Sequence, residues 1–597
     1  SNRRWVRMAD FIRLIVAVYF TAGLICLLLP GRTRGLIWAL ALAVSLAGFL
    51  SFVLIFQQRL SYCSAFLLWD GLSAVVALGI SFFGLVISVA SLSTIPSATN
   101  QYYGYLLWTL GAGVAAVVAN HFLLLVVFWG FLAITLYLMI NLAGPQAAYP
   151  AKKTLIIVGG SDSFLLLGLC LLYVLTGKLS FSEINYQIHS WQGAAAFLCL
   201  TVAAFAKAGA MPFHTWIPEI SETAWVPVMA FLPASLDKLL GIYLLARVCL
   251  HLFSFHPSLW LLLRLAGAVT VVAAVFMALV QHNMKKLLAY HAVSQVGYMV
   301  LGVATGTTVG VLGGLFHMIN HAVYKCCLFL GAGAVERQTG TSQLDDLGGL
   351  ARKMPVTFVT FLLASLAISG VPPLNGFFSK WMVYQGLVEA GRSGQTDWVV
   401  WLVMAMIGSA LTLASFLKII HSVFLGRTTN QQVNEAPSSL RLALVTLALI
   451  CVVFGLFYLP VPVSRLLGPA TGVPAPALSL SEPLIFIVWG LFLGILIFFL
   501  SLLSKKRYAA VFVGGEKLSQ QMHVSGTEFY QGVKQLPFLR RMYAGAEKRV
   551  FDVYEVGKQI VGYVTELFRA AHSGVLGAYL SWLLFGLLVV LSLFLRV

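Results

Sequence analysis

The 597-residue chain is strongly apolar: hydrophobic residues make up 60% of it and charged residues only 10%. Soluble domains carry about 25% charged residues, so this composition excludes a soluble protein and predicts an integral membrane protein in contact with lipid. The formal net charge of +18 comes from basic residues scattered through short loops, which is typical of membrane proteins and not of nucleic-acid binding.

Apolar stretches long enough to cross a bilayer recur along the whole chain. A transmembrane helix needs about 20 apolar residues, and lipid requires its backbone groups to be hydrogen-bonded within the segment. We therefore predict an all-α, multi-pass membrane protein with about 16 transmembrane helices. The expected spans lie near 11–30, 35–57, 71–94, 103–119, 121–143, 154–176, 190–210, 224–250, 258–281, 286–304, 309–334, 355–387, 398–425, 440–462, 481–504 and 574–596.

The basic residues in the loops predict the orientation of the spans. If the N-terminus lies outside, the short inner loops before the fifteenth span carry more than twice as many Lys and Arg residues as the outer loops. Cytoplasmic loops favour these residues, so we predict this orientation. The arginines before the first span run against it.

An internal repeat organises the predicted spans. Lys238 of span 8 and Lys418 of span 13 each end an Ala-Ser-x-x-Lys run, and Lys207 of span 7 and Lys380 of span 12 each lie close to prolines. Each pair is five spans apart, and an odd offset inverts topology, so we predict two inverted five-helix repeats. The predicted segments are 1–102 (spans 1–3), 103–250 and 258–425 (the two repeats), 440–504 (spans 14 and 15), 505–573 (a lateral surface segment) and 574–597 (the last span).

Residues 505–573 are too polar for a span, since they hold eleven Lys and Arg and six Asp and Glu. Apolar residues recur there at helical spacing, notably Tyr554, Val561, Val564 and Phe568. This pattern predicts a basic amphipathic helix that lies along the membrane surface. An ordinary cytoplasmic loop with a short helix is the alternative.

Lys207 is the first candidate for chemistry. It lies among alanines and a glycine, shortly before Pro212, which interrupts the helix. A charge within a span costs several kcal/mol by most estimates, so it usually faces the bundle interior or a water cavity. A buried lysine whose acidic partner can move is a proton switch. A structural ion pair between helices is the alternative.

Span 11 carries His317, His321 and Lys325 at i, i+4 and i+8, which places them on one helical face. Two histidines at this spacing can bind zinc, but no acidic ligand accompanies them. Histidine titrates near neutrality, so the face suits proton relay better than a metal. Core histidines bonded to backbone are the alternative.

Span 12 must be broken, because Pro372 and Pro373 lie between two glycines. Broken helices expose backbone dipoles and water at membrane depth, so Lys380 is expected in or beside a hydrated pocket. Asp162 in span 6 and Asp237, which adjoins Lys238, are the obvious acidic partners. The predicted proton path comprises Lys207, Asp162, Asp237, Lys238, His317, His321, Lys325, Lys380 and Lys418.

Several motifs resemble signatures of the antiporter-like subunits of respiratory complex I, a family that also serves energy-converting [NiFe] hydrogenases, formate hydrogenlyases and multisubunit Na⁺/H⁺ antiporters. The similar runs are AKAGAMPFHTWIP at 206–218, KLLAY and SQVGYM within 286–299, and the face from His317 to Lys325. GFFSK at 376–380 and WDGLS at 69–73 look like the chain L (chain 5) type. LPASLDK at 232–238 and GGSD at 159–162 look closer to the hydrogenase-type members.

The resemblance implies roles for the predicted residues. Lys207 would be the central pumping lysine of the first half-channel and Lys380 the exit-side lysine of the second, with the span 11 face connecting them. The family usually has a span 5 glutamate beside the span 7 lysine, and this chain has Gly130 there. Pro233 stands where span 8 often has histidine. Either Asp162 serves as the acid, or the protein pumps differently or less.

By resemblance, the chain translocates protons, or Na⁺, as a non-redox subunit of a redox-driven complex in a prokaryotic cytoplasmic (inner) membrane. That complex would be an energy-converting hydrogenase or a complex I-like NADH–quinone oxidoreductase of a respiratory chain. A multisubunit Na⁺/H⁺ antiporter, an ion-coupled inorganic-carbon uptake complex and a structural brace are the alternatives. No iron–sulfur or haem ligation pattern is evident, so iron–sulfur clusters and [NiFe] or flavin are expected on a peripheral arm, and no cofactor or metal in this chain.

Overall fold

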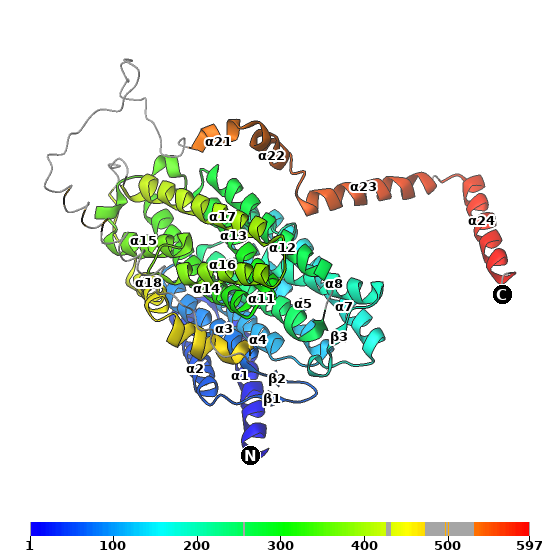
Figure 1. Cartoon of the computed structure of the whole chain (residues 1–597), viewed down its shortest axis with the longest axis horizontal. Coiled ribbons are helices and arrows are strands. Elements are labelled where there is room, and N and C mark those ends of the chain that lie inside the picture. Colours follow the sequence, from blue (N-terminus) through cyan, green and yellow to red (C-terminus); the bar gives the residue numbers. More distant parts are fainter. Residues whose placement is uncertain are drawn as a thin grey trace. The chain divides into compact units, whose positions relative to one another are not determined.

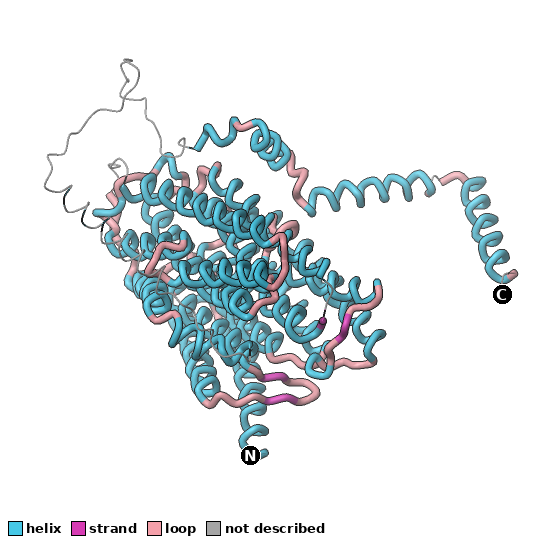
Figure 2. Tube along the Cα trace, viewed as in Figure 1, coloured by secondary structure: helices cyan, strands magenta, loops and turns pink. Residues whose placement is uncertain are grey.

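The computed structural model describes residues 2–254, 257–425, 432–471, 530–572 and 574–595, together with Leu493, Leu496 and Leu500. Within these ranges the chain is almost entirely helical, with four two-residue strands (Figures 1 and 2). It forms two units, Ser1–Gln535 and Leu536–Val597, which are described separately.

The all-α membrane fold predicted from the sequence is confirmed. In the described ranges, 13 helices are long and apolar enough to cross a membrane, and they match the predicted spans 1–3, 5–11, 13, 14 and 16. Span 4 is the more polar helix α4 (Thr99–Val117), and span 12 is divided between α15 (Pro355–Ser369) and α16 (Asn375–Arg392). Span 15 falls on residues that lie outside the described ranges.

The first part of the bundle combines the N-terminal helices with the first predicted repeat. Helix α1 packs against α4, and α2 packs against α3. β1 pairs with β2 in antiparallel fashion, and β3 pairs with β4 in parallel. The elements are α1 (Asn2–Leu28), α2 (Arg34–Gln57), β1 (Tyr62–Cys63), β2 (Leu68–Trp69), α3 (Gly71–Ser91), α4, α5 (Phe122–Asn141), α6 (Ala148–Thr154), α7 (Gly160–Thr176), β3 (Tyr186–Gln187), α8 (Trp191–Ala208), α9 (Trp216–Ser221), α10 (Val226–Phe231), α11 (Asp237–Arg247) and β4 (Phe253–Ser254).

The second part contains the second predicted repeat, and two of its helices are among the deeply buried ones of the bundle. α13 and α14 are buried along almost their whole length, as are α10 and α11. Helix α14 packs against α13, α15, α16 and α18, so it forms the centre of this part (Figure 1). The elements are α12 (Pro257–Leu279), α13 (Met284–Ala304), α14 (Thr308–Thr339), α15, α16, α17 (Trp398–Ile419), α18 (Ser438–Leu456), α19 (Gly468–Thr471) and α21 (Gln531–Gln535).

Side-chain caps fix where several of these helices begin. The carboxylate of Asp70 accepts the N–H of Ser73 (2.9 Å) at the start of α3, and the amide oxygen of Asn283 accepts the N–H of Lys286 (3.1 Å) at the start of α13. Such caps satisfy N–H groups that have no partner within the helix.

Both predicted helix breaks are present. α8 ends at Ala208 because Gly209 adopts a left-handed conformation (φ +74°), and α15 ends at Ser369 because Gly370 does the same (φ +80°). Pro212 and Pro373 each follow three residues after the glycine, and Pro372 precedes Pro373. The two breaks therefore correspond between the predicted repeats.

The two lysines beside the breaks do not correspond, although the sequence had paired them. Lys207 precedes its glycine in the last turn of α8, whereas Lys380 lies seven residues after Pro373, within α16. The residue seven positions after Pro212 is Glu219, in α9. A glutamate of the first repeat thus stands where the second repeat has its lysine.

The second unit consists of α22 (Pro537–Glu547), α23 (Val553–Ala571) and α24 (Leu576–Phe594). The helical form predicted for part of 505–573 is confirmed for α23, which exposes Val561, Val564 and Phe568. Its position along the membrane surface stays a prediction, and residues 505–529 lie outside the described ranges.

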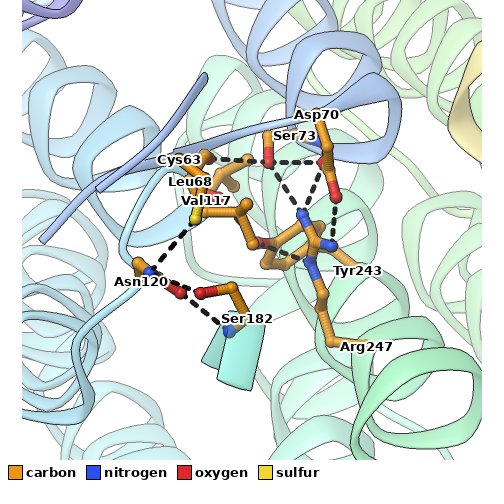
Figure 3. Close-up of polar contacts among 9 residues, drawn as sticks. All are labelled: Cys63, Leu68, Asp70, Ser73, Val117, Asn120, Ser182, Tyr243 and Arg247. Atoms are coloured by element: carbon orange, nitrogen blue, oxygen red, sulfur yellow. Dashed lines mark hydrogen bonds and ion pairs between the residues drawn. The ribbon is translucent and has the colours of Figure 1, made fainter. Parts of the chain in front are cut away.

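A cluster of polar side chains ties α3 to the far end of α11 (Figure 3). Arg247 contacts Asp70 with both terminal nitrogens of its guanidinium, one of them at 2.6 Å, and also donates to Ser73 Oγ (2.8 Å). Its Nε donates to the hydroxyl of Tyr243 (3.0 Å), which in turn donates to the carbonyl of Val117 (2.6 Å). We call Asp70, Ser73, Tyr243 and Arg247 the outer cluster, because this end is predicted to face outward.

Asn120 forms hydrogen bonds with the neighbouring loops at the same end (Figure 3). Its amide donates to the carbonyl of Ser64 (2.6 Å) and to Ser182 Oγ (2.9 Å), and its oxygen accepts the N–H of Ser182 (3.0 Å). Together with the outer cluster, these bonds join the loops before α3, after α4 and after α7 to the end of α11.

The outer cluster yields a stability prediction. Asp70→Asn leaves the Arg247 guanidinium, only 4% exposed, without its counter-charge, so we expect a loss of about 3 kcal/mol and a lower melting temperature in detergent. The double variant Asp70→Asn/Arg247→Met should melt closer to the wild type. Asp10→Asn, which breaks an exposed pair with Arg13, is the control. Equal melting temperatures for Asp70→Asn and the wild type would contradict the prediction.

Candidate functional site

The residues predicted to carry protons lie in the interior of the bundle. Apart from Asp162, which is partly exposed, each of them is at most 4% exposed. They come from α7, α8 and α11 in the first repeat and from α14, α16 and α17 in the second. Charges in such an interior are costly unless they are paired or solvated by bound water.

Lys207 and Asp237 form a buried ion pair. Nζ of Lys207 lies 3.6 Å from Oδ1 of Asp237, and both side chains are 1% exposed. Neither Lys207 Nζ nor Asp237 Oδ2 has a hydrogen-bond partner among the described residues. The ammonium also lies 5.7 Å from the ring centroid of Trp129. The pair is therefore close but incompletely satisfied, which leaves room for water or for movement.

Lys238 does not pair with the adjacent Asp237, contrary to what their adjacency suggested. Neighbouring residues on a helix do not face each other, and the π-helical turn Leu232–Leu236 directly precedes this point. The ammonium of Lys238 instead donates to the carbonyl of Ala208, the last residue of α8. The C-terminal end of a helix carries partial negative charge, which favours a cation there.

Asp162 lies opposite Gly130. A Cβ atom built on Gly130 would lie 3.9 Å from Oδ2 of Asp162, so the aspartate reaches the space that a side chain at position 130 would enter. Asp162 is also near enough to Lys207 for their charges to interact. Oδ1 of Asp162 is buried and has no hydrogen-bond partner among the described residues.

Asp162 does not cap a helix start, although aspartate is a favoured cap residue. α6 continues through the π-helical turn Leu155–Gly159 directly into α7, so the backbone around Asp162 is already hydrogen-bonded. A cap needs free N–H groups at a helix start, and none arises at this point of a continuous helix.

The histidine face of α14 is fully buried. His317 contacts Ser379 Oγ through Nδ1 (2.9 Å) and Gln295 Oε1 through Nε2 (3.1 Å). These partners are side chains of α16 and α13, so His317 is not a core histidine bonded to backbone. His321 forms no hydrogen bond of ordinary geometry within the described residues. Lys325 donates to the carbonyl of Leu288 (2.8 Å).

Lys380 and Lys418 also rest on backbone carbonyls. Lys380 donates to the carbonyl of Ile368 (2.9 Å), at the end of α15, and lies 4.7 Å from the ring centroid of Tyr298. Lys418 donates to the carbonyls of Leu279 (3.0 Å) and Gln281 (2.7 Å), where α12 ends. Of the five lysines in the predicted path, only Lys207 has a carboxylate within 4.0 Å among the described residues.

Some residues of the site were not predicted. Gln295, Tyr298 and Ser379 lie within the sequence motifs but had no predicted role, and the structure places them against His317 and Lys380. His291 is fully buried, and its ring centroid lies 4.9 Å from that of Phe416, at a tilt of 45°. The Phe416 ring also faces the ammonium of Lys325 at 5.5 Å. The only available signal was the presence of polar residues in a span, because their partners come from other helices.

The arrangement is a line of titratable groups that crosses the interior from α8 to α16. Lys325 and Lys380 each rest on a single carbonyl, and atoms of Lys207, Asp237 and His321 lack hydrogen-bond partners among the described residues. Buried polar groups of this kind usually bind water. Chains of such groups and water can pass protons.

Comparison with known proteins agrees with this fold. A family described as NADH:quinone oxidoreductase/Mrp antiporter, TM matches residues 119–412. An Na⁺/H⁺ antiporter component from Alkalihalophilus pseudofirmus is 32% identical over 419 residues, which is 65% of this chain and 52% of that protein. An NADH–quinone oxidoreductase component from Desulforudis audaxviator is 31% identical over 414 residues, 65% of this chain and 81% of that protein.

A solved archaeal respiratory membrane complex, the membrane-bound sulfane sulfur reductase, contains a chain of the same fold. The likeness covers 97% of this chain and 99% of that one, with a TM-score of 0.80 and 22% identity. This chain spans about half the length of the curated antiporter relatives it matches.

The fold and the buried polar line define an antiporter-like, multi-pass membrane subunit. The chain belongs to the NADH:quinone oxidoreductase/Mrp antiporter transmembrane family.

Proposed function

We propose that this chain translocates protons, or Na⁺, as a non-redox membrane subunit of a redox-driven complex in a prokaryotic cytoplasmic membrane. The observation that carries the proposal is the buried, incompletely satisfied pair of Lys207 and Asp237 at the end of a broken helix. A purely structural ion pair would gain from further hydrogen bonds, whereas a switch must be able to open.

The switch works through the charge on either member of the pair. A proton that binds Asp237 at the free Oδ2 removes the counter-charge of Lys207. The ammonium then loses stabilisation and releases its proton to water, which passes it towards Lys238 and the face of α14. Lys325 and Lys380, held by single carbonyls, accept and release protons in turn. In this scheme Lys380 is the exit-side group and Lys418 a further member near the inner end.

Partner subunits would supply the redox chemistry. The complex is either an energy-converting hydrogenase or a complex I-like NADH–quinone oxidoreductase, whose peripheral arm carries iron–sulfur clusters and [NiFe] or flavin. Supporting this choice, the match to the oxidoreductase relative covers 81% of that protein, against 52% of the antiporter relative.

A component of a multisubunit Na⁺/H⁺ antiporter is the second candidate, because several of the relatives carry that name. Such a complex would have no redox arm. Purification of the intact complex separates the two, since the first candidate requires co-purifying proteins with iron–sulfur clusters and the second requires only membrane subunits.

Lys207→Ala should abolish or strongly reduce ion pumping without unfolding the protein, because the buried pair loses its only cation. Pumping is measured in membrane vesicles that contain the assembled complex. Lys178→Ala, which removes an exposed loop lysine, is the matched control and should pump normally. Ion pumping at the wild-type level in Lys207→Ala would contradict the proposal that the pair is a proton switch.

In this chain Gly130 occupies the position where the family usually has a span 5 glutamate, and we propose that Asp162 takes over the role of that glutamate. Asp162→Asn keeps the shape but removes the charge, so we expect assembly with most pumping lost. Adding Gly130→Glu to Asp162→Asn should partly restore pumping, since the glutamate side chain enters the space beside residue 162. Pumping assays on both variants and on Asp237→Asn show which aspartate is the acid that pumping requires. If Asp162→Asn pumps normally while Asp237→Asn does not, Asp237 alone is the switching acid.

A further inference from the structure

The buried pair is shut off from the end of the bundle predicted to face outward. Between Asp237 and Tyr243, α11 presents the buried apolar residues Leu239, Leu240 and Ile242. Beyond Tyr243 the outer cluster and the bonds of Asn120 join the loops (Figure 3). A water route from Lys207 to the bulk therefore has to open elsewhere.

α9 is the element best placed to open such a route. It has six residues, and non-helical segments flank it at 210–215 and 222–225. A helix this short is unstable alone, so its position depends on its contacts with neighbours. At its start, Trp216 Nε1 donates to the carbonyl of Ala206 (3.1 Å), next to Lys207. The Trp216 ring also lies 6.0 Å from the ammonium of Lys238.

At its other end, two acidic residues tie α9 to both repeats. Glu219 Oε2 lies 2.9 Å from Nζ of Lys153, a fully buried residue of α6, the helix that continues to Asp162. Glu222 Oε2 lies 3.1 Å from Nζ of Lys286, at the start of α13. Lys285 also reaches the carbonyl of Glu222 (3.5 Å). α9 packs against both α6 and α13.

The two ion pairs differ in depth. Lys153 is not exposed at all, whereas the side chains of Lys286 and Glu222 are 34% and 41% exposed. Exposed pairs contribute little stability, so the pair of Glu222 and Lys286 separates more easily than the pair of Glu219 and Lys153. The exposed pair is therefore the point at which α9 is released first.

We propose that Glu219 and Glu222 are positioning residues that hold α9 as the inner gate of the Lys207–Asp237 pair. When their pairs with Lys153 and Lys286 open, α9 moves away, Trp216 leaves the carbonyl of Ala206, and water from the inner side reaches Lys207. This inference rests on the proposed function. It adds a gate outside the proton path and assigns it to one side of the membrane.

Hydrogen–deuterium exchange of the purified complex tests the gate directly. Glu222→Lys places like charges opposite each other, so amide exchange across 216–225 should rise by about tenfold or more. The charge-swapped double variant Glu222→Lys/Lys286→Glu should return exchange to the wild-type rate. Asp10→Asn, which breaks an exposed pair in α1, should leave exchange in 216–225 unchanged. Unchanged exchange in Glu222→Lys would overturn the proposal, as would failure of the swap to restore it.

Ion transport by the same variants tests the link to the buried pair. Glu222→Lys and the milder Glu219→Gln should shift the pH profile of transport measured from the inner side, and the swapped variant should restore the profile of the wild type. Variants that alter exchange but leave the pH profile unchanged would overturn the gating role. If the wild-type complex moves no ions, the proposed function fails, whereas the exchange data still decide whether these residues hold α9.

Discussion

The contact between Lys207 and Asp237 is the interaction on which the rest of the structure depends. Two opposite charges in a membrane interior persist only if neighbouring helices come close and supply polar groups. The break after α8 and the π-helical turn before α11 bring the two side chains together. Gly241 allows the approach, because a Cβ atom there would lie 2.5 Å from the backbone nitrogen of Ala208.

Three of the remaining lysines of the path are stabilised differently, by the ends of helices. Lys238, Lys380 and Lys418 each donate to a carbonyl at or next to the last residue of α8, α15 or α12. A helix end offers partial negative charge but does not titrate, so these ammonium groups are held without a competing proton acceptor. The ends of α8 and α15 are created by the two breaks, which explains why broken helices recur beside Lys238 and Lys380.

The sequence was sufficient to predict the features that depend on composition and on helical periodicity. Apolar length gave the spans, the proline–glycine runs located both breaks, and the four-residue spacing of His317, His321 and Lys325 placed them on one face. The sequence named Asp162 and Asp237 as acidic partners but assigned neither to Lys207, because that pairing depends on how the helices pack and on the π-helical turn before Asp237. The contact of Gln295 with His317 likewise depends on how α13 packs against α14.

Protons released by the Lys207–Asp237 pair are proposed to pass between the two repeats through Lys325. Ions moved per turnover should be counted in proteoliposomes that contain the assembled complex, with Lys325→Met replacing the buried ammonium by an uncharged chain of similar length. We expect the variant complex to assemble and turn over but to move fewer protons per turnover than the wild type. An unchanged number of protons per turnover in the variant would contradict it.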